Sequence, residues 1–228
     1  MPEQALANCG KALLKSRSLL ADEMNTPDSS GLLYRNRLSV TVGHSCLAGV
    51  KEENDDVIGV RIPEDDQLMT KGIVAVIADG VSVAEKGRDA AEICVQGFLN
   101  DYYDTPDTWT VANSSLKVLT SLNRWLFNLG VSYNNATQGF LTTLSILILK
   151  SNTAHIFHVG DSRISRIRQG IIEQLTRDHS ARLSEKDRQL TRALGLDVSL
   201  EIDYRRAEVE VGDVFCLSTD GMHEHVSD

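Results

Sequence analysis

The sequence contains few cysteines, no excess of basic residues and no long hydrophobic run. Its four cysteines lie far apart and form no CxxC pair, so neither a zinc knuckle nor a disulfide framework is indicated and a reducing cytoplasm fits best. With 32 acidic against 23 basic residues, the net charge of -9 disfavours binding to a nucleic-acid backbone. No apolar run is long enough to cross a bilayer, and residues 1–10 lack a signal-peptide pattern. We therefore expect a soluble, cytoplasmic protein without nucleic-acid or membrane partners.

Several common catalytic motifs are also absent. The sequence has no GxSxG, HExxH, GxxxxGK[ST] or GxGxxG. Their absence argues against the commonest nucleophilic hydrolases, zinc proteases and nucleotide-binding loops.

What the chain does contain is a set of apolar segments that each end in an aspartate beside a glycine. Such segments lead into Asp79-Gly80, Gly160-Asp161-Ser162 and Asp220-Gly221, and an acidic pair, Asp55-Asp56, precedes another predicted strand. Asp-Gly is a common turn signal, so each case alone favours a simple turn. Repetition after buried strands instead predicts carboxylates gathered at one rim of a sheet, where hard divalent cations bind. Such metals suit phosphoester hydrolysis.

The first half of the chain shows mostly helical spacing. Residues 3–24 have helical periodicity and predict an N-terminal helix, while 38–42 and 57–62 predict a hairpin and 63–70 a polar loop. Two long amphipathic segments then predict an antiparallel pair of helices, at residues 85–103 and 106–129.

The second half reads mainly as short strands. A meander is predicted from three runs and a continuation, at residues 142–149, 154–159, 163–168 and 171–175. A short helix is predicted at 184–194, and residues 202–211 and 213–219 predict a final hairpin. Strands and helices occur in blocks, which favours an α+β sandwich of antiparallel sheets with outer helices over a parallel doubly wound sheet.

An ordered set of motifs then makes a family resemblance specific. NDD, ADG, TTL, HVGDSR, LTRDHS, LTRALG and STDG follow one another between residues 39 and 228. In this order they resemble the metal-dependent type 2C family of protein serine/threonine phosphatases. Other segments of the sequence, including FLNDYYDTPDTW and LEIDYRR, are similar to the phosphatase parts of bacterial kinase–phosphatase fusion proteins.

The resemblance implies a fold, a reaction and a set of site residues. The fold is a four-layer α/β/β/α sandwich of two antiparallel sheets flanked by helices. The reaction is hydrolysis of phosphoserine and phosphothreonine in proteins by water activated at two Mn or Mg ions, with a third ion described for bacterial members. The implied metal ligands are Asp79, which bridges both ions, the Gly80 carbonyl, Asp220, the pair Asp55 and Asp56, and Asp161 with Glu224 for the third ion.

Some positions depart from the family pattern. Lys51 stands where an arginine usually grips the substrate phosphate, and lysine offers a point charge in place of a bidentate fork. Val81-Ser82-Val83 replaces a glycine pair, Leu141 replaces a glycine, and Glu224 replaces an aspartate. These departures motivate an alternative function, a catalytically weak phosphatase-like regulatory or binding module.

The expected domain organisation is an N-terminal helical extension, residues 1–36, followed by a phosphatase domain at 37–228. Family members continue past STDG, so we expect the domain to be truncated at its C-terminus. The fusion resemblance further predicts a kinase domain in the same native polypeptide.

Overall fold

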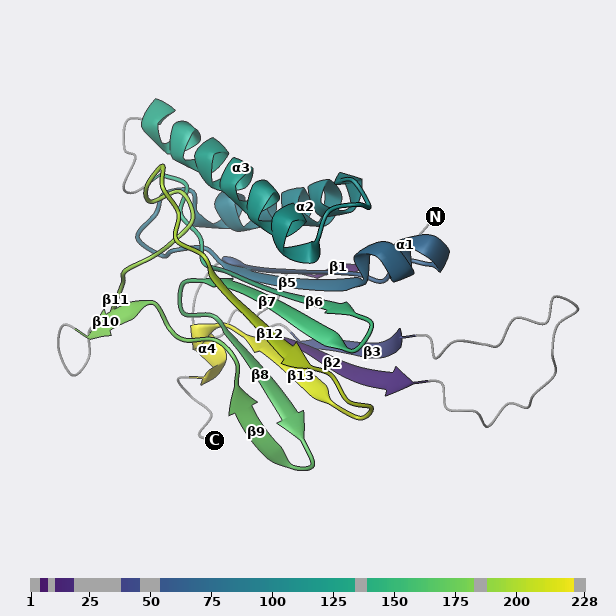
Figure 1. Ribbon diagram of the computed structural model, residues 1–228. Helices are drawn as coiled ribbons and strands as arrows, with labels where there is room; N and C mark the ends of the chain where they lie inside the picture. Colours follow the sequence, from purple (N-terminus) through teal and green to yellow (C-terminus); the bar gives the residue numbers. More distant parts are fainter. Residues whose placement is uncertain are drawn as a thin grey trace, which may run out of the picture.

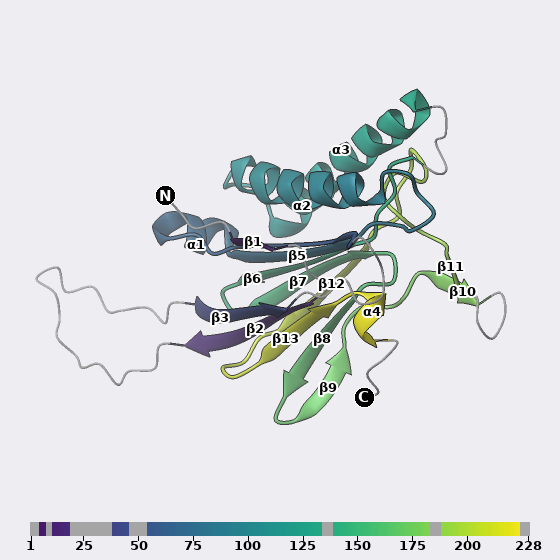
Figure 2. The ribbon, with the colours of Figure 1, turned by 180° about the vertical axis from the view of Figure 1, so that it is seen from behind.

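A computed structural model describes residues 5–7, 11–18, 38–45, 54–133, 139–182 and 188–223, with only the backbone described for the first two segments. Two antiparallel sheets stack face to face, and two long helices lie over the outer face of one of them (Figures 1 and 2). The predicted α+β sandwich of two antiparallel sheets with flanking helices is confirmed. Within the described residues, both long helices lie on the same side.

The larger sheet has six strands in the order β1-β4-β5-β6-β7-β12. They are β1 (Ala5–Ala7), β4 (Asp56–Arg61), β5 (Ile73–Asp79), β6 (Leu144–Lys150), β7 (Thr153–Val159) and β12 (Asp203–Glu208). The smaller sheet has the order β3-β2-β13-β8-β9. Its strands are β3 (Leu38–Ser45), β2 (Lys11–Ser18), β13 (Val214–Ser218), β8 (Arg163–Arg168) and β9 (Ile171–Gln174).

The remaining elements among the described residues are four helices and a small ribbon. The helices are α1 (Asp65–Lys71), α2 (Gly87–Asp104), α3 (Val111–Ser132) and α4 (Asp220–His223), and the ribbon pairs β10 (Ser180–Arg182) with β11 (Arg188–Leu190). The predicted helices at 85–103 and 106–129 are confirmed as α2 and α3. Among the described residues, no helix is long and apolar enough to span a membrane.

The central strand β5 is apolar along its length because both of its faces are buried. Val74, Val76 and Ala78 belong to the core beneath α2 and α3, while Ile73, Ala75 and Ile77 belong to the core between the sheets. A strand covered on both sides loses the polar half of the usual alternation. The same argument explains β6, whose residues from Leu144 to Leu149 are all buried.

The predicted N-terminal helix is wrong for its described residues. β1 pairs with β4 in the larger sheet, and β2 pairs with both β3 and β13 in the smaller one. Apolar spacing over so short a stretch is compatible with either structure, and strand neighbours distant in sequence decided the outcome.

Other predicted connections are also wrong, because neighbouring strands enter different sheets. β3 and β4 lie in different sheets and do not form the predicted hairpin. β8 is not part of a meander with β7 but pairs with β13 and β9. β12 and β13 also lie in different sheets, so the predicted final hairpin does not form. The predicted loop at 63–70 contains most of α1, and residues 188–190 of the predicted helix at 184–194 form β11.

Candidate metal centre

Two of the predicted ligands face each other on adjacent strands. Asp79, the last residue of β5, lies opposite Asp56, the first residue of β4. Side chains of directly opposite residues lie on the same face of an antiparallel pair. Asp79 continues the alternation of Ala75 and Ile77, so both carboxylates belong to the face between the sheets.

The end of the smaller sheet reaches this pair. Thr219 follows β13, and its hydroxyl donates a hydrogen bond of 3.1 Å to Oδ2 of Asp56. The next residue is Asp220, the first residue of α4. Two strand ends from different sheets therefore bring Asp56, Asp79 and the Thr219-Asp220 segment to one edge of the sandwich.

A third strand end is tied to the same edge through hydroxyl groups. The backbone N–H of Asp79 donates to Oγ1 of Thr143 over 3.1 Å, and that oxygen lies 2.8 Å from Oγ of Ser162. Ser162 directly follows Asp161 in the turn after β7. The turn begins with Gly160 at a φ of 110°, and a Cβ there would lie 2.5 Å from that of Thr143. Asp161 is thus carried by a loop that is fixed to the backbone of Asp79.

Gly80 has a packing role in addition to its predicted role as a ligand. Its N–H donates to the carbonyl of Asp55 over 3.2 Å. A Cβ at Gly80 would lie 2.4 Å from the backbone carbon of Gly87, the first residue of α2. Only glycine permits the end of β5 to approach the helix this closely.

The donor types fit Mn or Mg, which prefer several hard oxygen ligands. Two carboxylates held on one face repel each other, and a divalent cation between them removes that cost. Within the described residues, however, no three His, Cys, Asp or Glu side chains are placed closely enough to hold an ion. Lys51 and Glu224 lie outside the described residues. The ligand assignments therefore stay predictions.

The histidine on β7 that faces the core is structural. His158 is buried, with Nδ1 2.8 Å from the hydroxyl of Ser145 and Nε2 3.0 Å from the carbonyl of Arg177. Burial, followed by the neighbouring His179 ring, lowers its pKa to about 4. His155 lies on the opposite face of β7, where Nδ1 is 2.9 Å from the hydroxyl of Tyr204. The two histidines therefore point to opposite faces of β7.

Sequence reasoning missed the hydroxyl groups that position the strand ends. Thr143 and Ser162 connect β5 to the turn after β7, and Thr219 connects the two sheets. The sequence offered a weak signal for these hydroxyl groups, because each residue lies within one of the family motifs: Thr143 in TTL, Ser162 in HVGDSR and Thr219 in STDG. Their partners could not be deduced without knowing which strands lie side by side.

Comparison with known proteins agrees with this architecture. The sequence profile of the protein phosphatase 2C family matches residues 49–228. Protein phosphatase PhpP of Streptococcus pneumoniae is 29% identical over 169 residues, which cover 67% of this chain and 68% of PhpP. The serine/threonine phosphatase stp of Listeria monocytogenes is 25% identical over 194 residues, covering 76% and 73%.

A solved structure supports the fold. The Mycobacterium tuberculosis serine/threonine phosphatase PstP/Ppp superposes with a TM-score of 0.64 at 17% identity, covering 99% of this chain and 82% of that chain. The family profile and the two phosphatase relatives define the class as a phosphoprotein phosphatase. The chain belongs to the protein phosphatase 2C family.

Proposed function

We propose that this protein removes phosphate from phosphoserine and phosphothreonine in proteins, using two Mn or Mg ions held at the acidic edge. The observation that carries the proposal is the facing pair Asp56 and Asp79, in a chain of this family. When bound, the metals supply a nucleophile by lowering the pKa of water and polarise the phosphoryl oxygens.

The roles of the chain's own residues follow from their positions. Asp79 and Asp56 would hold the ions from one face of the larger sheet, and Asp220 would add a carboxylate from the smaller sheet. Thr219 orients the Asp56 carboxylate by donating to it. Asp55 and the Gly80 carbonyl would complete the set of oxygen ligands around the two ions. Asp161 and Glu224 would hold a third ion. Lys51 would contact the substrate phosphate as a point charge.

A phosphothreonine peptide tests this function directly. Phosphate release is measured with Mn, with Mn and excess chelator, and with the Asp79→Asn variant as the matched control. Turnover that requires Mn and disappears in the variant supports the enzyme. If the intact protein shows no Mn-dependent turnover, the result contradicts the enzyme and favours the alternative function, a catalytically weak regulatory or binding module.

The cellular setting is also a proposal. The widely spaced cysteines support a cytoplasmic enzyme, and the resemblance to fusion proteins supports a kinase domain in the same native polypeptide. An intact-mass measurement of the endogenous protein tests the kinase domain, because a mass equal to that of the 228-residue chain would contradict it.

A further inference from the structure

Among the described residues, no strand pairs with the outer edge of β12. β12 is the last strand of the larger sheet and pairs with β7 on one side. The N–H of Val209 donates to the carbonyl of Asn152, which lies opposite it in the same register. Antiparallel alternation therefore directs the backbone of Arg205 toward β7 and that of Tyr204 and Arg206 outward. Within the described chain, nothing pairs with these outward groups.

One end of this edge is closed by side chains. The carbonyl of Glu208, the next outward position, accepts hydrogen bonds from Arg166 over 3.0 Å and from Arg168 over 3.1 Å. These bonds confirm the outward direction of the alternate carbonyls. The open edge is therefore short and starts at a defined register, from Tyr204 to Arg206.

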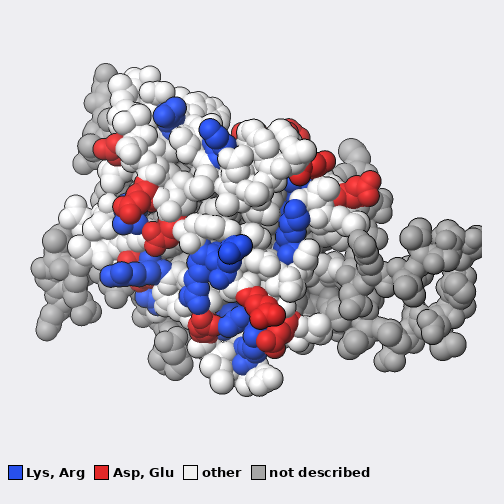
Figure 3. Space-filling view, in the orientation of Figure 1, with Lys and Arg blue, Asp and Glu red and all other residues white. Residues whose placement is uncertain are grey.

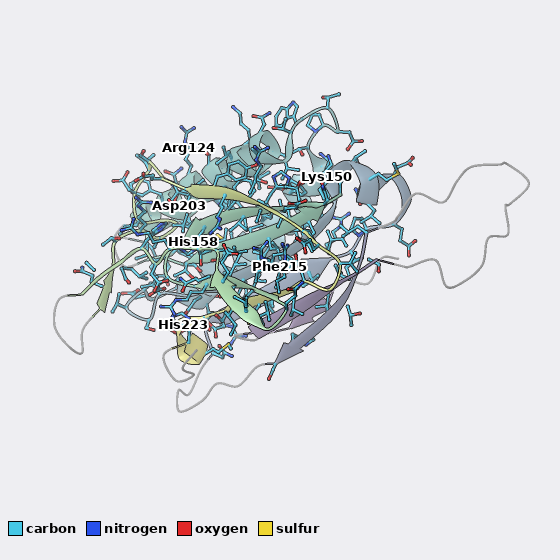
Figure 4. All side chains as sticks on the ribbon, turned by 60° about the horizontal axis from the view of Figure 1, so that its bottom comes forward. Arg124, Lys150, His158, Asp203, Phe215 and His223 are labelled. Carbon is cyan, nitrogen blue, oxygen red and sulfur yellow. The ribbon has the colours of Figure 1, made fainter. Side chains whose placement is uncertain are left out.

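A cavity of about 410 Å³ lies at the other end of the edge. Its lining combines apolar side chains with polar ones from β7, β12 and the segment after β9, namely Ile156, His158, Leu175, Thr176, Arg177, Ile202, Asp203, Tyr204 and Arg205. Figure 4 shows His158 and Asp203 near each other, as expected from their opposite positions on β7 and β12. A side chain from a strand added to β12 would enter this cavity.

Basic side chains lie beside this edge in a protein that is acidic overall. On the face seen in Figure 3, Lys and Arg side chains gather in the middle, with acidic side chains below them and to their upper left. Arg205 is paired with Glu173 over 2.7 Å. For the guanidinium groups of Arg177 and Arg206, no hydrogen-bond or ion-pair partner occurs among the described residues. Two cations therefore flank the open edge, in a chain with a net charge of -9.

We propose that the β12 edge and its cavity bind an extended acidic segment of the phosphoprotein substrate, away from the phosphorylated residue. The segment adds as a strand beside β12, so that backbone hydrogen bonds supply affinity. Its carboxylates contact Arg177 and Arg206, which supply selectivity and faster association. The role as a substrate site rests on the proposed phosphatase function, whereas binding of the segment does not.

The test compares two phosphothreonine peptides that share a core, one with and one without an acidic extension. In Arg206→Pro the outward N–H and the charge are lost, whereas Arg206→Ala removes only the charge. Proline is tolerated on an edge strand where its N–H would face outward. Arg177→Glu reverses the second cation, and Arg124→Glu on the exposed surface of α3 is the charge-matched control.

The readout is the ratio of kcat/KM for the extended peptide to that for the unextended peptide. We expect this ratio to fall about tenfold in Arg177→Glu and in Arg206→Pro, with a smaller fall in Arg206→Ala and no change in Arg124→Glu. The change should lie in KM, because the docking segment does not touch the reacting phosphate. Fluorescence anisotropy of the unphosphorylated acidic segment gives its Kd, which should rise in parallel.

Each outcome separates the two proposals. An unchanged ratio and an unchanged Kd in Arg177→Glu would refute docking at this edge. Equal losses on both peptides would also refute it, because the variants would then act on the reaction site. Absence of turnover on either peptide contradicts the phosphatase function, and the anisotropy measurement still decides docking. Self-association of the intact chain that Arg206→Pro abolishes would identify the occupant as a second copy and overturn the proposal. If Arg206→Pro does not fold, Arg177→Glu alone carries the test.

Discussion

Carboxylates occur in two contrasting surroundings in this protein. On the flank formed by β8, β9 and β12 they face arginines, as in the 2.7 Å contacts of Arg168 with Asp213 and of Arg163 with Asp178. At the strand ends, Asp56 faces Asp79, and a threonine hydroxyl donates to Asp56. The flank balances charge within the chain, which serves stability. The strand ends place like charges opposite each other, an arrangement that favours a bound cation.

The largest effect is expected for Asp79→Asn. It removes one of the facing charges with little change in volume, so we expect Mn-dependent phosphatase activity to fall at least about a hundredfold. The melting temperature without metal should change little, because asparagine nearly preserves the volume of the side chain. A thermal melt with and without Mn, beside the activity assay, measures both. Retained activity would exclude Asp79 from the site.

On the flank, Asp213→Ala should have the opposite profile. The Asp213 side chain is 1% exposed and accepts hydrogen bonds from Arg168 and from the N–H of Glu210. We expect the free energy of unfolding to fall by about 2 kcal/mol while kcat/KM at low temperature is retained. Denaturant unfolding is the measurement, and Asp101→Ala on the exposed face of α2 is the control. Unchanged stability would remove the contrast between the two regions.

The stability of the protein should also depend on pH through the buried His158. Its folded pKa of about 4 lies below its ordinary value, because burial disfavours the charged ring. The unfolded chain therefore binds the extra proton first. Stability is fully present above about pH 6.5 and falls by up to about 3 kcal/mol as the pH decreases to 4. His158→Gln should remove this component in denaturant melts across that range, and an unaltered pH profile would contradict the assignment.

Paired carboxylates on the flank should respond only at more acidic pH. The pKa of Asp213 is lowered overall: burial raises it, but the hydrogen bonds from Arg168 and Glu210 outweigh that effect. Its contribution is therefore present above about pH 4 and is lost below that value.

The smallest expected effect is at Lys51, the cation predicted near the acidic edge. Lys51→Arg should raise kcat/KM a few-fold, because a guanidinium contacts phosphate in a bidentate manner. Lys51→Ala should lower kcat/KM mainly through a higher KM. Wild-type kinetics in Lys51→Ala would refute its contact with the substrate phosphate.

Much of the site could be anticipated from the sequence because strand ends carry local signals. An apolar run that stops at Asp79-Gly80 marks both the end of β5 and the position of its carboxylate. The pairing of Asp56 with Asp79 is not local, and neither is the contact of Thr219 with Asp56 across two sheets. Such contacts depend on register, which a single sequence does not specify.

Local residue patterns were enough to identify β5 and β6 as buried strands, α2 and α3 as amphipathic helices, and the aspartates that follow the strands. The sheet that each strand joins depends on tertiary contacts. β7 and β8 are consecutive yet lie in different sheets, and the N-terminal segment supplies strands to both. The physical reason is that both sheets present an apolar face to the same core, so a strand's own pattern fits either one. Pairing with strands distant in sequence makes the choice.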